Sequence, residues 1–264
     1  MTQIAKTHSV TFGHGPRRAL ALHCTLAHAG AWRGVGSALA DKLTVTAIDM
    51  PGHGKSADWS GEGDLHRACT DACLPLLTQP LDVIGHSFGA TVALRLAIEH
   101  PEMVRSLTMI EPVLFAAARA DAPQELALHL KEAQPYLDAL EDGDMALAAR
   151  LFNRLWGDGT PWDDFRPSAR AYMTERMHYI PAQTPSIFND DARLLAPERL
   201  SRVSMPCLLL AGGKSPAITR TINAALARRL ADVRSVTIPG AAHMAPMTHP
   251  SEAADAIAGL IEVA

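Results

Sequence analysis

Short apolar runs recur along the chain, and segments with helical spacing separate them. The runs are rich in leucine and β-branched residues and show little polar alternation, which is typical of parallel strands covered on both faces. They span residues 19–26, 43–50, 81–85, 104–110, 207–211 and 233–238. Helices are predicted at 33–41, 64–77, 89–100, 217–231 and 251–263. This alternation predicts an α/β fold built from right-handed βαβ units, with a mostly parallel sheet and helices on both faces.

The alternation stops between residues 115 and 203. That stretch shows only helical periods, such as Gln124–Leu140 and Met145–Trp156, and turns rich in glycine and proline. It holds nine of the aromatic residues, which number 4 Trp, 3 Tyr and 6 Phe in the whole chain. These side chains can form a small core of their own or roof a ligand cleft. We therefore predict an α/β core made of 1–114 and 204–264 and a helical insertion at 115–203.

Composition narrows the class of protein. Of the 264 residues, 48% are hydrophobic and 20% are charged, so the chain can bury a sizeable core. The formal net charge of −4 predicts no basic face for nucleic acid or an acidic membrane. Segment 1–10 lacks the apolar stretch of an export signal, no run reaches the roughly 20 apolar residues of a membrane span, and the four cysteines form no disulfide pattern. We expect a soluble cytoplasmic protein with a small-molecule substrate; its oligomeric state stays open.

The sharpest local motif is Gly85-His86-Ser87-Phe88-Gly89, which follows an apolar strand and opens a helix. In a G-x-S-x-G turn of this kind the backbone is tight, so larger side chains at the glycine positions would clash. The serine hydroxyl is presented at the strand tip, with the helix N-terminus behind it. We predict that Ser87 is a nucleophile. The alternative is a glycine-rich turn in which Ser87 caps the helix.

A serine hydroxyl needs a base, and His243 is the best candidate among the 12 histidines. It lies in a loop of small residues just after the last predicted strand, and such loops meet at the carboxyl edge of a parallel sheet. The other histidines are expected to be unremarkable, and His129 is expected at the surface.

The imidazole in turn needs a carboxylate to orient it. The loop after 207–211 contains no acid, whereas Glu111 directly follows the strand 104–110 and precedes a proline. We predict that Glu111 is this acid, with a surface glutamate or an ion-pair partner as the alternative. The chain order is then serine, acid, histidine, which is the order expected after a nucleophile turn of this type.

Acyl transfer also requires donors for an oxyanion. One is expected to be the main-chain N–H of Phe88, directly after the nucleophile. The second is expected in the loop after the first long strand, with Thr25 as the first candidate and Leu26 as the next. The pocket around these groups is expected to be apolar. Its predicted lining is Leu26, Trp156, Met244 and Met247.

These motifs resemble those of the α/β-hydrolase superfamily, and the similarity runs nearly end to end. The matching segments are His23-Cys24-Thr25 at the oxyanion loop, Asp49–Ser56 with the pattern D-x-x-G-x-G-x-S, the turn Gly85–Gly89, and Gly240–His243 at the histidine loop. The resemblance implies an α/β-hydrolase fold in which the helical insertion 115–203 is the family's cap.

The chain departs from the family pattern at two positions. Cys24 replaces the usual glycine of the oxyanion loop, and Ser215 stands where most relatives carry the aspartate of the triad. Some relatives, haloalkane dehalogenases among them, place the acid after the strand before the cap, which is the position of Glu111. Haloalkane dehalogenases and epoxide hydrolases use an aspartate nucleophile, so Ser87 argues against both activities.

The sequence therefore predicts a serine hydrolase that cleaves an ester or a related acyl bond through an acyl-enzyme. Ser87, His243 and Glu111 would form the triad, and no metal or organic cofactor is required. Cys69 and Cys73 are four apart on a predicted helix, but no second pair completes a metal site, so they are expected to be buried thiols. The alternatives are hydrolysis of a carbon–carbon bond in a dicarbonyl compound, an enol-lactonase, and a ligand-binding homologue without turnover.

Overall fold

Seven strands form one sheet in the computed structural model, which describes residues 7–264. Their order is β1-β3-β2-β4-β5-β6-β7; β1 runs antiparallel to β3, and the other neighbouring pairs are parallel. The strands are β1 Ser9–Phe12, β2 Arg17–Leu22, β3 Leu43–Ile48, β4 Leu81–His86, β5 Val104–Ile110, β6 Cys207–Gly212 and β7 Val233–Ile238. The mostly parallel sheet and its six predicted strands are confirmed.

The largest differences from the prediction concern β1 and β2; other strand ends differ by one or two residues. β1 is missing from the prediction, because the four residues SVTF are too few and too polar to form an apolar run. β2 ends at Leu22 instead of continuing to Leu26, because the chain leaves the sheet there and Leu26 has a φ of 63°. The residues predicted as the end of this strand therefore form a loop at the carboxyl edge of the sheet.

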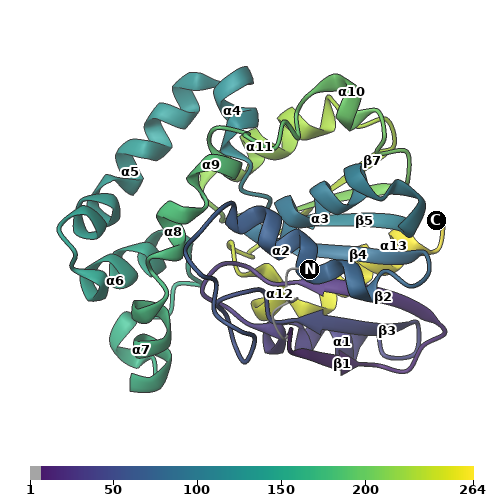
Figure 1. Ribbon diagram of the computed structural model, residues 1–264, viewed down its shortest axis with the longest axis horizontal. Coiled ribbons are helices and arrows are strands. Elements are labelled where there is room, and N and C mark those ends of the chain that lie inside the picture. Colours follow the sequence, from purple (N-terminus) through teal and green to yellow (C-terminus); the bar gives the residue numbers. More distant parts are fainter. Residues whose placement is uncertain (1–6) are drawn as a thin grey trace.

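Helices cover both faces of the sheet (Figure 1). The helices of the α/β core are α1 Arg33–Ala38, α2 Leu65–Cys73, α3 Phe88–Glu99, α11 Ala217–Ala227, α12 Ala245–Thr248 and α13 Pro250–Ile261. Successive strand residues point to opposite faces. In β2, Ala19 and Ala21 join the cluster that contains α1 and α13, whereas Leu20 and Leu22 join the one that contains α2, α3 and α11. Both faces of the sheet are therefore buried.

Between β5 and β6 the described chain forms helices and turns but no strand. Its α-helices are α4 Phe115–Asp121, α5 Pro123–Glu141, α6 Met145–Trp156, α7 Pro167–Glu175, α8 Tyr179–Ala182, α9 Thr184–Ile187 and α10 Pro197–Leu200. The two helices named from the sequence are α5 and α6, and α6 has the predicted bounds. In Figure 1, α5, α6 and α7 stand to one side of the sheet. The division into core and cap at residues 115 and 203 stays a prediction.

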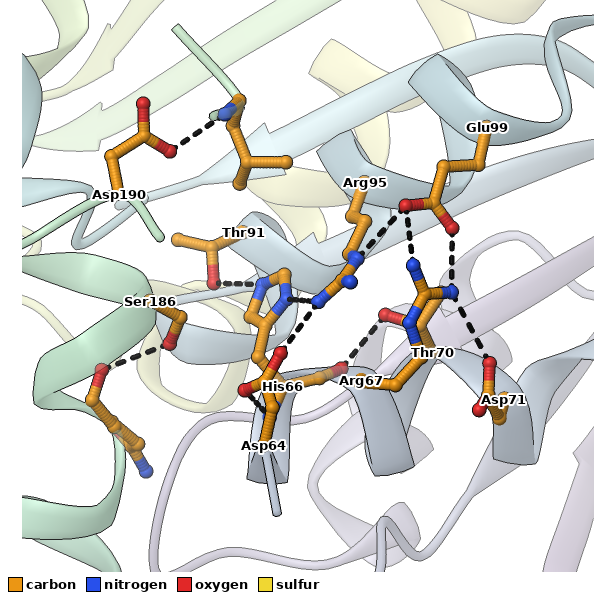
Figure 2. A network of polar contacts seen from close by, with 12 residues as sticks. Asp64, His66, Arg67, Thr70, Asp71, Thr91, Arg95, Glu99, Ser186 and Asp190 are labelled. Atoms are coloured by element: carbon orange, nitrogen blue, oxygen red, sulfur yellow. Dashed lines mark hydrogen bonds and ion pairs between the residues drawn. The ribbon is translucent and has the colours of Figure 1, made fainter. Parts of the chain in front are cut away.

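A buried polar network ties α2 to the first turn of α3 (Figure 2). Arg95 donates from Nη1 to Asp64 Oδ2 at 2.9 Å and to His66 Nδ1 at 3.0 Å. Nδ1 of His66 is thus an acceptor, so its Nε2–H donates to Thr91 Oγ1, 3.2 Å away. The Thr91 hydroxyl donates to the carbonyl of Phe88 at 2.7 Å. These bonds hold the start of the helix that follows Ser87.

Because several histidines are buried, we expect the free energy of unfolding to fall when the pH is lowered mildly. Burial is the largest cause that lowers the pKa of His23 and His129 to about 4 and that of His53 to about 3, from an ordinary value of 6.5. Between pH 6.5 and about 4 the unfolded chain binds protons that the folded protein does not. The free energy of unfolding should therefore be highest above pH 6.5 and fall by about 1.4 kcal/mol per pH unit for each such histidine below it.

Urea unfolding at pH 7.5, 6.5 and 5.5 measures this slope. The matched variant is His129→Phe, because the His129 ring stacks on Phe115 and its Nδ1 has no hydrogen-bond partner. It should keep the packing and lose about one histidine's share of the slope. A free energy of unfolding that stays constant from pH 7.5 to 5.5 would contradict the prediction.

Other expectations are settled by burial. His129 is only 3% exposed, so its predicted surface position is wrong; α5 turns it toward Phe115 and Trp156. The four cysteines are buried and free, as predicted for Cys69 and Cys73.

Among residues 7–264, no helix has the length and apolar character to cross a bilayer. The predicted lack of an export signal concerns residues 1–10, of which 1–6 lie outside the described residues, and the cytoplasmic location stays a prediction.

Candidate active site

Ser87 lies at the tip of β4, in the turn that leads into α3. Its backbone has φ 57° and ψ −119°, a conformation that L-residues rarely adopt. A Cβ on Gly85 would overlap the backbone of Gly89, and one on Gly89 would overlap the carbonyl of Leu22. The two glycines are therefore required by close backbone approaches, and the tight turn that the motif predicts is present.

The register of the sheet places Glu111 beside Ser87. His86 of β4 is the partner of Ile110 of β5, so the residue after each strand reaches the same edge. The Ser87 N–H donates to Ile110 O at 2.9 Å, and the Glu111 N–H donates to Leu210 O at 2.8 Å. The neighbouring strands thus anchor the backbone of both residues.

The carboxylate of Glu111 is fully buried and accepts three hydrogen bonds. Its Oε1 accepts from Gly212 N–H at 2.5 Å and from the Ser215 hydroxyl at 2.8 Å. Its Oε2 lies 3.1 Å from His243 Nδ1. Ser215, in the turn after β6, therefore donates to the Glu111 carboxylate.

His243 connects Ser87 and Glu111. Its loop follows β7, and its Nε2 lies 3.0 Å from Ser87 Oγ. With Nδ1–H donating to Glu111, Nε2 is free to accept the proton of the Ser87 hydroxyl. The ring is 4% exposed, and the Trp156 ring meets it edge-on at 4.7 Å between centroids. The three residues chosen from the sequence thus form one continuous chain of hydrogen bonds.

His86, inside the motif, supports this arrangement and was not singled out from the sequence. Its Nε2 lies 2.8 Å from the carbonyl oxygen of His243, so it donates there, and the two rings are 5.1 Å apart. Burial, and to a lesser extent the charge of the nearby His243, holds the pKa of His86 well below its ordinary value, so the His86 ring is neutral. It positions the backbone of the histidine loop.

The N–H groups of the candidate oxyanion donors differ in whether they already have a hydrogen-bond partner. Among the described residues, the N–H groups of Thr25 and Phe88 have no hydrogen-bond acceptor. The N–H of Leu26 faces His53 Nε2 at 3.4 Å. Thr25 is therefore a better donor than Leu26, the second candidate from the sequence.

Residues with unfavourable backbone angles are concentrated around Ser87. Five described residues other than glycine have positive φ angles, namely Leu26, Ser87, Glu111, Asp190 and Arg193. The first three belong to the candidate site. Such conformations cost free energy and persist where the surroundings enforce them, as is common at functional sites.

Two cavities open onto Ser87 and His243. The larger cavity has a volume of about 720 Å³. The second one, here called the cap cavity, is lined in part by α5 and α9 and has a volume of about 500 Å³. All four side chains predicted as pocket lining face the larger cavity: Leu26, Trp156, Met244 and Met247. Both volumes fall in the range that binds small molecules.

A residue of the segment between β5 and β6, here called the cap segment, reaches the loop that carries Thr25. Gln183 is 3% exposed; its Nε2 donates to Thr25 Oγ1 at 2.8 Å, and its Oε1 lies 3.1 Å from the same hydroxyl. The sequence offers no signal for this contact, because Gln183 lies between the short helices α8 and α9, far along the chain from Thr25. It ties the cap segment to the loop that carries the Thr25 amide.

The other groups at the site offer little competing chemistry. Burial raises the pKa of the Cys24 thiol to about 12, so no thiolate forms there at neutral pH. Across residues 7–264, no three histidine, cysteine or acidic side chains are grouped so that they could hold a metal ion. The Asp49 carboxylate accepts from the N–H groups of Ala29 and Lys55 and so caps the loops that border the cavity.

Sequence comparison defines the class of protein. Residues 19–256 match the alpha/beta hydrolase family. The chain is 30% identical over 250 residues to the pimeloyl-[acyl-carrier protein] methyl ester esterase of Methylococcus capsulatus, a match that covers 90% of this chain and 92% of that protein. It is 34% identical over 120 residues to the esterase of the same name from Nitrosomonas europaea, where the match covers 46% of each chain. The chain therefore belongs to the alpha/beta hydrolase family, and it is a hydrolase.

Solved structures agree with this fold. A hydrolase from Pseudomonas aeruginosa PA01 superimposes with a TM-score of 0.74 at 21% identity, covering 97% of this chain and 94% of that one. The enol-lactonase from Burkholderia xenovorans LB400 gives a TM-score of 0.70 at 17% identity, covering 98% and 97%. At these identities the likeness concerns the fold alone, and the predicted α/β-hydrolase fold is confirmed.

Proposed function

We propose that this protein is a serine carboxylesterase that works through an acyl-enzyme. The observation that carries the proposal is the buried chain of hydrogen bonds from Ser87 through His243 to Glu111, at the meeting point of two cavities. The esterases among the relatives support an ester as the substrate class. Neither carbon–carbon cleavage nor lactone opening is favoured by a specific contact in the site.

The geometry suits each step of ester hydrolysis. Ser87 Oγ attacks the carbonyl carbon while His243 Nε2 takes its proton. Glu111 keeps Nδ1 protonated and stabilises the imidazolium. The N–H groups of Thr25 and Phe88 donate to the oxyanion. His243 then protonates the leaving alcohol, and a water molecule activated by the same ring releases the acid and restores Ser87.

Two assays test the proposal. A fluorophosphonate probe should label the protein at Ser87, because only an activated serine reacts rapidly, and a panel of carboxylic esters should be hydrolysed at neutral pH. Ring-cleavage diketones and enol-lactones, assayed in parallel with product analysis, distinguish the alternative reactions. A protein that is neither labelled nor active on any ester would be a ligand-binding homologue, and the proposal would be wrong.

A further inference from the structure

The two cavities approach Ser87 from different sides and have separate walls. Apart from the residues where they meet, the larger cavity is lined by residues of β1, α1, α7 and α12, of the C-terminal end of α6, and of the loops after β2, β3 and β7. The cap cavity is lined by residues of α4, α5, α8 and α9 and of the loops beside them. The residues common to both are Thr25, Ser87, Phe152, Trp156 and His243. An ester carbonyl at Ser87 therefore has room on both sides of the bond that is cleaved.

Two aromatic side chains of α6 stand at the boundary between the cavities. Phe152 and Trp156 are four residues apart, so they share one face of the helix. Trp156 is 5% exposed and is held by edge-on contacts with His243 and His129, while Phe152 packs edge-on against Tyr136. Because both rings border both cavities, Phe152 and Trp156 form a wall between the groups that occupy them.

Both cavities combine apolar and polar residues. The cap cavity is lined by apolar residues such as Val113, Phe115, Leu137 and Ile187, together with Arg119, Glu141 and Asn189. The larger cavity has Met173, Met244 and Met247 among its apolar residues. Its polar residues include His8 before β1, His28 after β2, Arg33 at the start of α1 and Lys55 after β3. Each cavity can therefore hold a different part of one substrate.

We propose that the substrate is an ester with two substantial parts, whose acyl and alcohol groups occupy different cavities on the two sides of the Phe152–Trp156 wall. This inference rests on the proposed esterase function and narrows it. Each cavity alone has the volume of a small-molecule site, so a methyl ester would leave one of them with a single carbon atom.

Kinetics with unactivated esters test whether the groups on both sides of the ester contribute to catalysis. Methyl hexanoate, hexyl acetate and hexyl hexanoate differ only in which side of the carbonyl carries a long chain. With both cavities filled, kcat/KM for hexyl hexanoate should exceed that for each of the other two by at least tenfold, since apolar contact is gained on both sides. Equal values for hexyl hexanoate and one of the others would overturn the inference, because one side would then contribute nothing.

Two matched substitutions test the separation of the cavities. Leu137→Trp in α5 fills the cap cavity, and Met173→Trp in α7 fills the larger one; both side chains are half-buried, and each lines one cavity only. One variant should lower the ratio of kcat/KM for methyl hexanoate to methyl acetate by at least tenfold. The other should lower the corresponding ratio of hexyl acetate to methyl acetate. Ratios are compared because they cancel a general loss of activity.

Labelling with the fluorophosphonate probe and the thermal midpoint verify that each variant is folded. Leu140→Phe and Ala169→Phe form a second matched pair if a tryptophan variant does not fold. If the unsubstituted protein hydrolyses esters but both variants lower the same ratio, or neither variant lowers either ratio, this inference is overturned and the esterase function is not. Absence of both labelling and turnover in the unsubstituted protein would overturn the esterase function, and the inference with it.

Discussion

The Ser87→Ala protein is expected to lose ester turnover by a factor of about 10⁴ or more. The hydroxyl supplies the atom that forms the acyl-enzyme, and no other side chain at the site can replace it. The Cys24 thiol stays protonated because burial raises its pKa to about 12. The free energy of unfolding should change by less than about 1 kcal/mol, because the hydroxyl makes one side-chain hydrogen bond, to His243.

The matched control is Ser106→Ala. Ser106 is also buried, and its hydroxyl donates to another side chain, Asp82 Oδ1, at 2.7 Å, but it lies within β5 and away from His243. This change should lower stability by about 1 kcal/mol and leave kcat within about twofold. Ester hydrolysis by Ser87→Ala at the unsubstituted rate would refute the nucleophile assignment, even if the fold were intact.

Glu111→Gln is expected to lower kcat by about 10³- to 10⁴-fold while the fold is kept. The amide has nearly the shape of the carboxylate, and its oxygen can still accept from Gly212 and Ser215. Its NH₂ group then faces His243 Nδ1, which must become an acceptor. The imidazole proton moves to Nε2, and the Ser87 hydroxyl loses the group that would take its proton. Steady-state kinetics together with the labelling rate measure the effect.

A second substitution tests whether the charge or the position of the acid matters. Ser215 Oγ lies 2.8 Å from Glu111 Oε1. An aspartate at position 215 would therefore place its carboxylate close to the position of the lost Glu111 carboxylate. Ser215→Asp introduced into the Glu111→Gln protein should recover at least tenfold in kcat. If Glu111→Gln alone has the kcat of the unsubstituted protein, Glu111 is not the acid: either another carboxylate serves, or the serine works with the histidine by itself.

Ser87, His243 and Glu111 could be selected from the sequence because local rules governed each choice. A strand, a G-x-S-x-G turn and a helix specify a nucleophile position whatever the rest of the fold does. In a parallel sheet, residues that follow strands all reach one edge, so Glu111 and His243 could be chosen by their place after strands. The four pocket residues followed from the same rule, since Leu26, Met244 and Met247 flank those loops and Trp156 ends a helix of the insertion.

Contacts between segments far apart in the chain were beyond the sequence. The bond from Gln183 to Thr25 spans 158 residues, and that from His86 to the His243 carbonyl spans 157. The burial of His129 was missed because apolar residues lie on more than one face of its helix: Leu126 is buried, whereas Leu128 is 64% exposed. Only packing on Phe115 and Trp156 shows which face is covered.

By itself, then, the amino-acid order determined the alternation of strands and helices, the tight serine turn and the sequence of candidate catalytic groups. Hydrophobic period, glycine and proline are local properties that act before any tertiary contact forms. Only the tertiary structure decided that the Glu111 carboxylate accepts hydrogen bonds from Gly212 of β6 and from Ser215 just after it, and that two aromatic rings lie between the cavities beside Ser87. Both depend on how helices and loops from distant parts of the chain pack together, which no local pattern encodes.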